Sequence, residues 1–185
     1  VVVGAGRGYQ KREFDIYGID ISESRERFIE GMDIAVKAWT EDTFSYNGSF
    51  FNIPEVRVIP KPVQKPRPPI MVGGGGERRT LRIVAELADE WNAVGVDLDG
   101  YRRKREVLER HCEKVGRDPA LIRHSQMSGF IVGKDDSGVL DHLRLIGERL
   151  GHDAVVGSMT ADPGRVLEAA RDRDWLVGTP SEGVD

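Results

Sequence analysis

The chain has 185 residues, 39% hydrophobic and 31% charged, which suits one globular domain with a hydrophobic core and does not favour disorder. Its net charge of −4 comes from interspersed acidic and basic residues, which excludes a continuous basic surface for nucleic acid. No apolar run reaches the ~20 residues of a membrane-spanning helix, and no signal-peptide pattern is present. The single cysteine, Cys112, cannot form an internal disulfide. We therefore expect a cytoplasmic protein.

The first predicted elements are a strand and a helix. Residues 1–4 form an apolar run typical of a buried strand, and because no methionine precedes it we expect further chain upstream. Residues 4–18 are polar and show no helical face, which predicts a long loop. Ser22 or Ser24 then caps a helix that runs to about Trp39, with apolar residues at helical spacing.

A small hairpin is predicted at about residues 44–59, as an excursion from the main fold. Hydrophobic residues flank Asn47-Gly48, a pair that strongly favours a hairpin turn, and residues 56–59 are strand-like. Six of the nine prolines lie in residues 54–69. This stretch is therefore predicted to be a stiff, extended connector.

A strand, a glycine loop and a helix are predicted next. Residues 70–72 are apolar, Gly73-Gly74-Gly75-Gly76 follows, and residues 77–87 have helical spacing. A strand at 91–94 leads to a helix that Asp97 or Asp99 caps and Gly116 ends. The remaining predicted elements are a turn at Asp118-Pro119, a strand at 128–132, a helix at 140–150 and helix starts at Asp162-Pro163 and Thr179-Pro180.

Alternation of strands and helices predicts an α/β fold with a parallel sheet. An open doubly wound sheet and a closed (β/α)8 barrel both fit this alternation. A complete barrel takes about 250 residues, and the chain starts inside a strand and stops at a helix start. We therefore expect residues 1–185 to be a single-domain part of a TIM (β/α)8 barrel that lacks the N-terminal strands and the last strand.

The first glycine-rich loop, Gly4-Ala5-Gly6-Arg7-Gly8-Tyr9, directly follows a strand. A dinucleotide fingerprint requires the third glycine three positions after the second, with a helix at once, and Gly8 comes too early. The alternatives are a ligand loop of another kind and a loop that only turns the chain.

The second glycine-rich loop, Gly73 to Gly76, is a candidate phosphate site. Glycine lets the backbone approach a ligand closely, and free N–H groups at a helix start attract an anion. Thr80 can add a hydroxyl donor, and Arg78 or Arg79 can offset the charge of Glu77. No Gly-Lys-Ser/Thr ending follows, which excludes a P-loop. The alternative is a tight strand-to-helix turn.

The remaining polar residues indicate no further site. The four histidines, His111, His124, His142 and His152, lack metal-ligand spacing, so no metal site is predicted. Each histidine is expected at the surface or half-buried. No nucleophile elbow or catalytic triad is present, and no catalytic residue is assigned.

Several runs of the sequence resemble the bacterial luciferase-like monooxygenases, in that family's order and over residues 1 to about 115. The runs are Gly6-Arg7-Gly8-Tyr9-Gln10-Lys11-Arg12-Glu13-Phe14, Tyr17-Gly18, Ser24-Arg25-Glu26-Arg27-Phe28, Lys61-Pro62-Val63-Gln64-Lys65-Pro66-Arg67-Pro68-Pro69-Ile70, the second glycine loop, and Ala88-Asp89-Glu90-Trp91-Asn92. The resemblance implies that the chain is an internal part of a flavin-binding barrel.

The same resemblance implies a phosphate site made by both loops. Arg7 would hold the flavin phosphate from one side, beside the backbone of Gly8 and Tyr9. The second loop would hold it from the other side, through Gly74, Gly75, Gly76, Glu77 and Thr80. The first loop resembles the branch that uses FMN, whereas residues 73–81 resemble the branch that uses the deazaflavin coenzyme F-420, so both cofactors stay open.

The function that the resemblance implies is a flavin-dependent monooxygenase that uses reduced FMN and oxygen on a small organic substrate. A flavin reductase would supply the reduced cofactor, and the parent protein would be a homo-oligomer. One alternative is an F-420-dependent oxidoreductase that transfers hydride. Another is a non-catalytic or truncated barrel that binds flavin.

Overall fold

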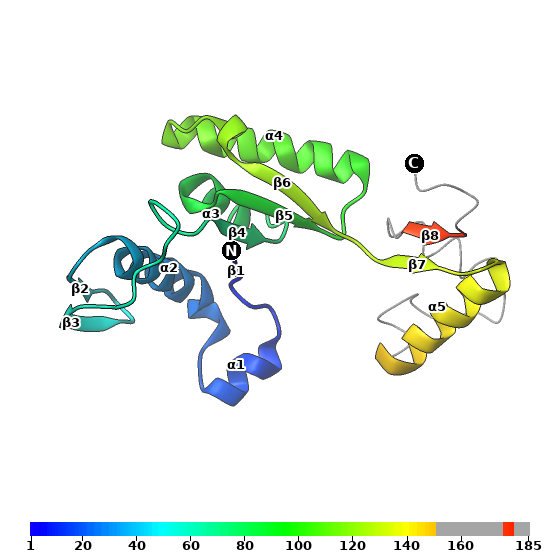
Figure 1. The fold of residues 1–185 in the computed structure, drawn as a ribbon, viewed down its shortest axis with the longest axis horizontal. Helices are drawn as coiled ribbons and strands as arrows, with labels where there is room; N and C mark the ends of the chain where they lie inside the picture. Colours follow the sequence, from blue (N-terminus) through cyan, green and yellow to red (C-terminus); the bar gives the residue numbers. More distant parts are fainter. Residues whose placement is uncertain (151–175, 180–185) are drawn as a thin grey trace. The chain divides into compact units, whose positions relative to one another are not determined.

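A four-stranded sheet in the order β1-β4-β5-β6 is the central feature of the computed structural model, which describes residues 1–150 and 176–179 (Figure 1). The strands are β1 Val3–Ala5, β4 Ile70–Gly73, β5 Glu90–Val94 and β6 Arg123–Met127. β1 runs parallel to β4, and β4 runs parallel to β5. The α/β class and the parallel sheet predicted from the sequence are confirmed.

The chain forms two compact units. The first comprises Val1–Asn92 and Lys104–Ser125, and the second comprises Ala93–Arg103 and Gln126–Asp185. The core of the first unit lies between the sheet and helix α3, Thr80–Leu87, which packs against β4. Alternate residues of β4 and β5 are buried on one face of the sheet, and α3 and α4 (Leu98–Val115) contribute further buried side chains. The buried residues are Ile70, Val72 and Trp91 of the strands and Leu81, Val84, Leu108 and Cys112 of the helices.

Helix α1, Lys11–Tyr17, corrects the prediction of a continuous loop over residues 4–18. Local interactions stabilise this helix. Lys11 forms an ion pair with Asp15 one turn later at 2.7 Å, and Gly18 ends the helix in the left-handed conformation with φ of 65°. No residue of α1 is buried. The helix therefore has no buried apolar face, and a prediction that relied on the periodicity of such a face could not find it.

Helix α2, Ser24–Thr40, matches the predicted helix but not its cap. Ser24 is its first residue, and neither Ser22 nor Ser24 caps it. The side chain of Asp20 instead accepts the N–H of Ser22 and starts a 3-10 turn, η1, at Ile21–Glu23. The 3-10 turn thus leads the chain directly into α2.

The predicted hairpin is formed by antiparallel strands β2, Phe44–Asn47, and β3, Asn52–Val56. Its loop is longer than the two-residue turn that Asn47-Gly48 favours. Glu30 of α2 accepts the N–H groups of Ser49 and Phe50 at 2.7 and 3.0 Å, and that of Phe51 at 3.2 Å. The predicted strand at 56–59 does not extend past Val56.

The proline-rich connector has neither helix nor strand from residue 57 to residue 69, as predicted. It is anchored to the sheet at its end. Arg67 donates to the Asp89 carboxylate at 2.5 Å, and the same carboxylate oxygen accepts the N–H of Ile70 at 2.7 Å. Asp89, at the start of β5, therefore fixes the entry of the chain into β4.

Helix α3 begins at Thr80, three residues after the predicted start, because residues 77–79 form a turn. Asp97 caps α4 by accepting the N–H of Gly100 at 2.5 Å, and Gly116 follows α4 with φ of 68°. Asp97 is thus the cap of the two candidates, and the predicted end of the helix at Gly116 is confirmed.

In the second unit, strand β7 (Phe130–Val132) pairs in parallel with β8 (Leu176–Gly178), and helix α5 is Asp136–Leu150 (Figure 1). The helix starts four residues before the predicted start. β6 and the strand β8 were not predicted, and Asp118-Pro119 opens a 3-10 turn, η2, at Pro119–Leu121. The predicted helix start at Asp162-Pro163 and most of that at Thr179-Pro180 lie outside the described residues, as does His152.

None of the helices in the described residues is long and apolar enough to cross a membrane.

Candidate functional site

Both glycine-rich loops leave the same edge of the sheet. Ala5, the last residue of β1, is paired with Val72 of β4 in a parallel register. Parallel neighbours have their carboxyl ends at one edge, so the chain after Ala5 and the chain after Gly73 start side by side. Right-handed crossover connections in α/β folds predict that the strands at residues 1–4 and 70–72 are parallel neighbours with both loops at one end, and the pairing confirms this prediction.

The second loop has its carbonyl groups bound to the protein. The indole N–H of Trp91 donates to the Gly74 oxygen at 2.7 Å, and the Lys104 ammonium donates to the Gly75 oxygen at 2.7 Å. The N–H of Leu81 reaches the Gly76 oxygen at 3.0 Å. Four successive carbonyls are engaged, because the Glu77 oxygen contacts His111 at 2.8 Å.

The backbone amides of the same loop have fewer hydrogen-bond partners in the described residues than its carbonyls have. Gly74 donates to the Asn92 oxygen at 3.0 Å, which continues the β4–β5 pairing. Among residues 1–150 and 176–179, the amides of Gly75, Gly76 and Glu77 donate to no protein acceptor. Gly76 and Glu77 are exposed, and Gly75 is half-buried. These three N–H groups are therefore available to an anion at the start of α3.

Two glycines keep the space around Thr80 open. A Cβ atom on Gly76 would lie 3.0 Å from Thr80 Oγ1, and one on Gly74 would lie 3.5 Å from Thr80 Cγ2. Gly74 also has φ of 116°, a conformation that other residues rarely adopt. The loop thus needs glycine both for its backbone path and for the room beside the Thr80 hydroxyl.

Arg7, Gly8 and Tyr9 of the first loop are all exposed. Within the part of the chain that the structure describes, the Arg7 guanidinium makes no hydrogen bond or ion pair, and none links this loop to the second one. Gly8 has φ of 81°, and a Cβ there would lie 3.0 Å from the Phe14 ring. The sheet brings the two loops to one edge, and no hydrogen bond or ion pair among the described residues joins them.

These residues fit a phosphate group. The second loop offers three N–H donors and the positive end of α3, the Thr80 hydroxyl lies beside them, and the first loop offers an unpaired guanidinium. Glu77 is the one opposing charge in this set, and Lys104 lies 3.8 Å from its carboxylate. A donor set of this kind can bind the oxygens of a phosphate group.

Lys104 and His111 are residues of this loop's environment that the sequence did not reveal. Both lie on α4, seven positions apart and hence on one face, and they contact carbonyls 29 and 34 positions earlier in the chain. His111 was predicted only as a surface or half-buried histidine; that exposure is confirmed for His111, His124 and His142. The helical spacing of Lys104 and His111 was the only available signal.

A polar cluster lies on the other face of the sheet from Trp91. Ser125 of β6 donates to Glu90 at 2.7 Å and accepts from the Asn92 amide at 3.0 Å. Asn92 is paired with Gly73, the last residue of β4 before the second loop. The cluster therefore presents polar side chains on the sheet face next to the glycine loop, and it was not predicted.

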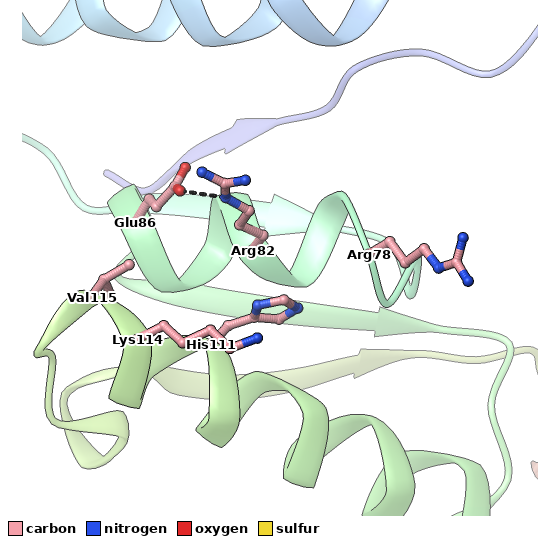
Figure 2. Close-up of a pocket in the computed structure, with 6 residues that line it drawn as sticks. All are labelled: Arg78, Arg82, Glu86, His111, Lys114 and Val115. Atoms are coloured by element: carbon pink, nitrogen blue, oxygen red, sulfur yellow. Dashed lines mark hydrogen bonds and ion pairs between the residues drawn. The ribbon is translucent and has the colours of Figure 1, made fainter.

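A hollow of about 350 Å³ lies between α3 and α4 (Figure 2). Its lining has more basic than acidic residues, and its one carboxylate, Glu86, forms an ion pair with Arg82 at 2.7 Å. The residues that line the hollow are Arg78, Arg82, Glu86, His111, Lys114 and Val115. It contains none of the residues predicted to hold the phosphate. The hollow adjoins the second loop, because Arg78 follows Glu77 and His111 contacts the Glu77 oxygen.

Known structures share this fold. A monooxygenase of Streptomyces bottropensis superposes with a TM-score of 0.74 at 23% identity, over 98% of this chain and 54% of the other. An F420-dependent secondary alcohol dehydrogenase gives a TM-score of 0.74 at 17% identity, over 98% of this chain and 57% of the other. The chain has the α/β fold of the luciferase-like barrels and spans about half of such a structure.

Sequence comparison gives the family. The model of the luciferase-like monooxygenases matches residues 1–185, and the chain belongs to this family. An uncharacterised protein of Mycobacterium tuberculosis, Rv0940c, is 30% identical over 146 residues, which are 76% of this chain and 49% of that protein. The FMNH(2)-dependent dimethylsulfone monooxygenase of Pseudomonas putida is 27% identical over 145 residues, 73% of this chain and 37% of that protein. The chain thus spans half or less of these relatives.

Proposed function

We propose that the protein is a flavin-dependent monooxygenase that uses reduced FMN on a small organic substrate. Its family is that of luciferase-like monooxygenases, and a relative at 27% identity carries the name of an FMNH(2)-dependent monooxygenase. The observation that carries the proposal is the pairing of β1 with β4, because it starts both glycine loops at one edge of the sheet. Barrel enzymes bind phosphate at this end of their strands.

The residues of the two loops would hold the phosphate of the cofactor. The amides of Gly75, Gly76 and Glu77 would donate to its oxygens, with Thr80 Oγ1 as a further donor and Gly74 as the turn that lets the backbone approach. Arg7 would approach from the first loop with Gly8 and Tyr9 beside it, and a guanidinium can bind two phosphate oxygens at once. Reduced flavin, once held there, supplies the electrons that activate oxygen.

A second candidate is an oxidoreductase that uses the deazaflavin coenzyme F-420 for hydride transfer. Residues 73–81 resemble the F-420 branch, and solved proteins with this fold include an F420-dependent alcohol dehydrogenase and an F420-dependent tetrahydromethanopterin reductase. The same donors would serve the phosphate of either cofactor. The third candidate is a barrel that binds flavin without catalysis.

The remaining parts of the proposal concern partners and organisation. A flavin reductase would supply the reduced cofactor, the intact protein would be a cytoplasmic homo-oligomer, and residues 1–185 would belong to a single barrel domain with a hairpin at about 44–59. The reductase, the oligomer and the barrel rest on the family resemblance, whereas the cytoplasmic location and the hairpin rest on the sequence features described above.

One experiment separates the three candidates. The intact protein is purified, and the absorption spectrum and mass of any retained small molecule are recorded, followed by titration with FMN and with F-420. Tight binding of FMN, with oxygen consumption when reduced FMN and a substrate are added, supports the monooxygenase. Preference for F-420 supports the second candidate, FMN binding without turnover of a substrate supports the third, and binding of neither cofactor rejects all three.

A further inference from the structure

Past the Gly74 amide, which pairs with Asn92, the glycine loop between β4 and α3 is held through its carbonyl groups. Gly74, Gly75, Gly76 and Glu77 each have their oxygen engaged, by Trp91, Lys104, Leu81 and His111 respectively. A carbonyl can only accept, so His111 Nε2 carries the proton in its contact. Three of these four donors are side chains of β5 and α4, and the fourth is the backbone N–H of Leu81 in α3.

Because the peptide unit is planar, the direction of each carbonyl also fixes the direction of the amide that follows it. In a trans peptide the C=O of one residue and the N–H of the next point in opposite directions. The oxygens of Gly74, Gly75 and Gly76 face their protein donors, so the N–H groups of Gly75, Gly76 and Glu77 face away from them. The donors behind the loop thus determine where its unpaired amides point.

Lys104 contacts both Gly75 and Glu77 of the loop. Its side chain is 22% exposed, and its ammonium lies 2.7 Å from the Gly75 oxygen and 3.8 Å from the Glu77 carboxylate. A Cβ on Gly75 would lie 3.1 Å from Lys104 Cε, so the lysine stem packs closely against this glycine. The ammonium offsets the Glu77 charge, which otherwise repels an anion at the loop.

His111 supports the peptide two positions further along the chain, at Glu77. It lies two turns further along α4, and Figure 2 shows its side chain on the side of α4 that faces α3. Its contact with the Glu77 oxygen holds the turn that precedes α3. Because Lys104 and His111 lie on one helix, α4 acts on two points of the loop as a rigid body.

We propose that Lys104 and His111 are positioning residues, which hold the Gly74–Glu77 loop so that its amides are preorganised for a phosphate monoester. This inference rests on the proposed phosphate site. The residues act from behind the loop through its carbonyls. They increase affinity by removing the cost of ordering the loop when the ligand binds.

The test compares Lys104→Met in the intact protein with the control Lys114→Met, an exposed lysine on the same helix. Dissociation constants are measured for FMN and for riboflavin, which lacks the phosphate. Hydrogen exchange of the Gly75, Gly76 and Glu77 amides is measured without ligand. We expect Lys104→Met to weaken FMN binding about tenfold, the factor for one lost hydrogen bond, and to leave riboflavin binding unchanged. Exchange at these amides should accelerate, and Lys114→Met should change neither quantity.

A second pair of variants covers the case in which Lys104→Met does not fold. His111→Leu removes the donor to Glu77, and His111→Gln restores an N–H at a similar position. We expect His111→Leu to lower the ratio of FMN to riboflavin affinity and to speed amide exchange, and His111→Gln to recover both. Equal losses for the two ligands, or unchanged exchange in Lys104→Met and His111→Leu, overturn the inference.

The proposed function can fail separately. Wild-type protein that binds neither FMN nor F-420 rejects the flavin proposal. Titration of that protein with inorganic phosphate then decides the inference, with perturbed loop amides in wild type and weaker binding to Lys104→Met as the expected result. Absence of any phosphate effect at these amides rejects the inference as well.

Discussion

The indole N–H of Trp91 in β5 donates a hydrogen bond of 2.7 Å to the carbonyl oxygen of Gly74, the first residue after β4. Trp91 is fully buried, and its ring also meets the His124 ring edge-on, with 5.4 Å between the centroids. The core thereby fixes the point at which the glycine loop leaves the sheet. Packing and site geometry depend on the same side chain.

Replacing Trp91 should therefore affect stability. Trp91→Phe keeps an aromatic ring but leaves the half-buried Gly74 oxygen without its donor, and we expect the free energy of unfolding to fall by about 1–3 kcal/mol. Urea unfolding of the intact protein measures this change. Trp39→Phe is the control, since the Trp39 indole makes no hydrogen bond within the described residues. A larger loss in the control would contradict this account.

Gly74 and Gly73 form a matched pair for the loop backbone. Gly74 has φ of 116°, whereas a Cβ on Gly73 would meet nothing within 4 Å and its φ is not in the positive range. Gly74→Ala should reduce stability by about 1–3 kcal/mol through backbone strain, and Gly73→Ala should change it much less. Thermal unfolding of both variants checks this. Equal effects would show that the positive φ is not what requires glycine.

The sequence predicted those parts of this arrangement that have a local signal in the chain. The apolar runs of β1 and β4 and the glycines after each were sufficient to place both loops at one edge. α1 was missed because its stability comes from the Lys11–Asp15 pair and Gly18, not from an apolar face. β6, Arg-His-Ser-Gln-Met, has a single apolar residue, and its strand conformation comes from its place beside β5.

The site was only partly predictable for a related reason. Glycines and Thr80 are adjacent in sequence, so their proximity was visible. Lys104 and His111 reach the loop across 29 and 34 positions, and only packing of α4 brings them there. Nothing local distinguishes them from the other charged residues of this helix.

Asp89 gives a pH dependence with a definite sign. Burial raises the pKa of its carboxyl, but the Arg67 guanidinium and the Ile70 N–H outweigh this effect and hold the pKa below its usual 3.8. A lowered pKa means that the ionised form stabilises the fold above pH 3.8, and that this contribution is lost as pH falls through the native pKa.

Asp89→Asn should therefore be less stable than wild type at neutral pH. The difference between the two proteins should narrow as pH falls below about 4, because wild-type Asp89 is then protonated as well. Urea unfolding between pH 2.5 and 7 measures the difference, at roughly half-unit steps chosen to resolve a single titration. A difference that stays constant over this range would exclude Asp89 as the titrating group.

Glu30 should control the order of the hairpin loop. Its carboxylate accepts three N–H groups of residues 49–51, and these donors hold its pKa below the ordinary value although burial opposes them. Glu30→Gln leaves one acceptor oxygen, so hydrogen exchange at Ser49, Phe50 and Phe51 should accelerate. Asp33→Asn, an exposed residue of the same helix, is the control. Unchanged exchange at all three amides would argue that the hairpin orders itself.

The central claim is that the loops of β1 and β4 hold one phosphate together, and Arg7→Ala tests it most directly. Fluorescence titration of the intact protein with FMN and with riboflavin gives four dissociation constants for wild type and variant. We expect Arg7→Ala to weaken FMN binding by about 1.5–3 kcal/mol, or roughly 10- to 150-fold, with riboflavin unaffected. Thr80→Val should have a smaller effect of the same kind, and Arg12→Ala, an exposed arginine of α1, should have none. Equal losses for FMN and riboflavin in Arg7→Ala, or no loss for FMN, would contradict the claim.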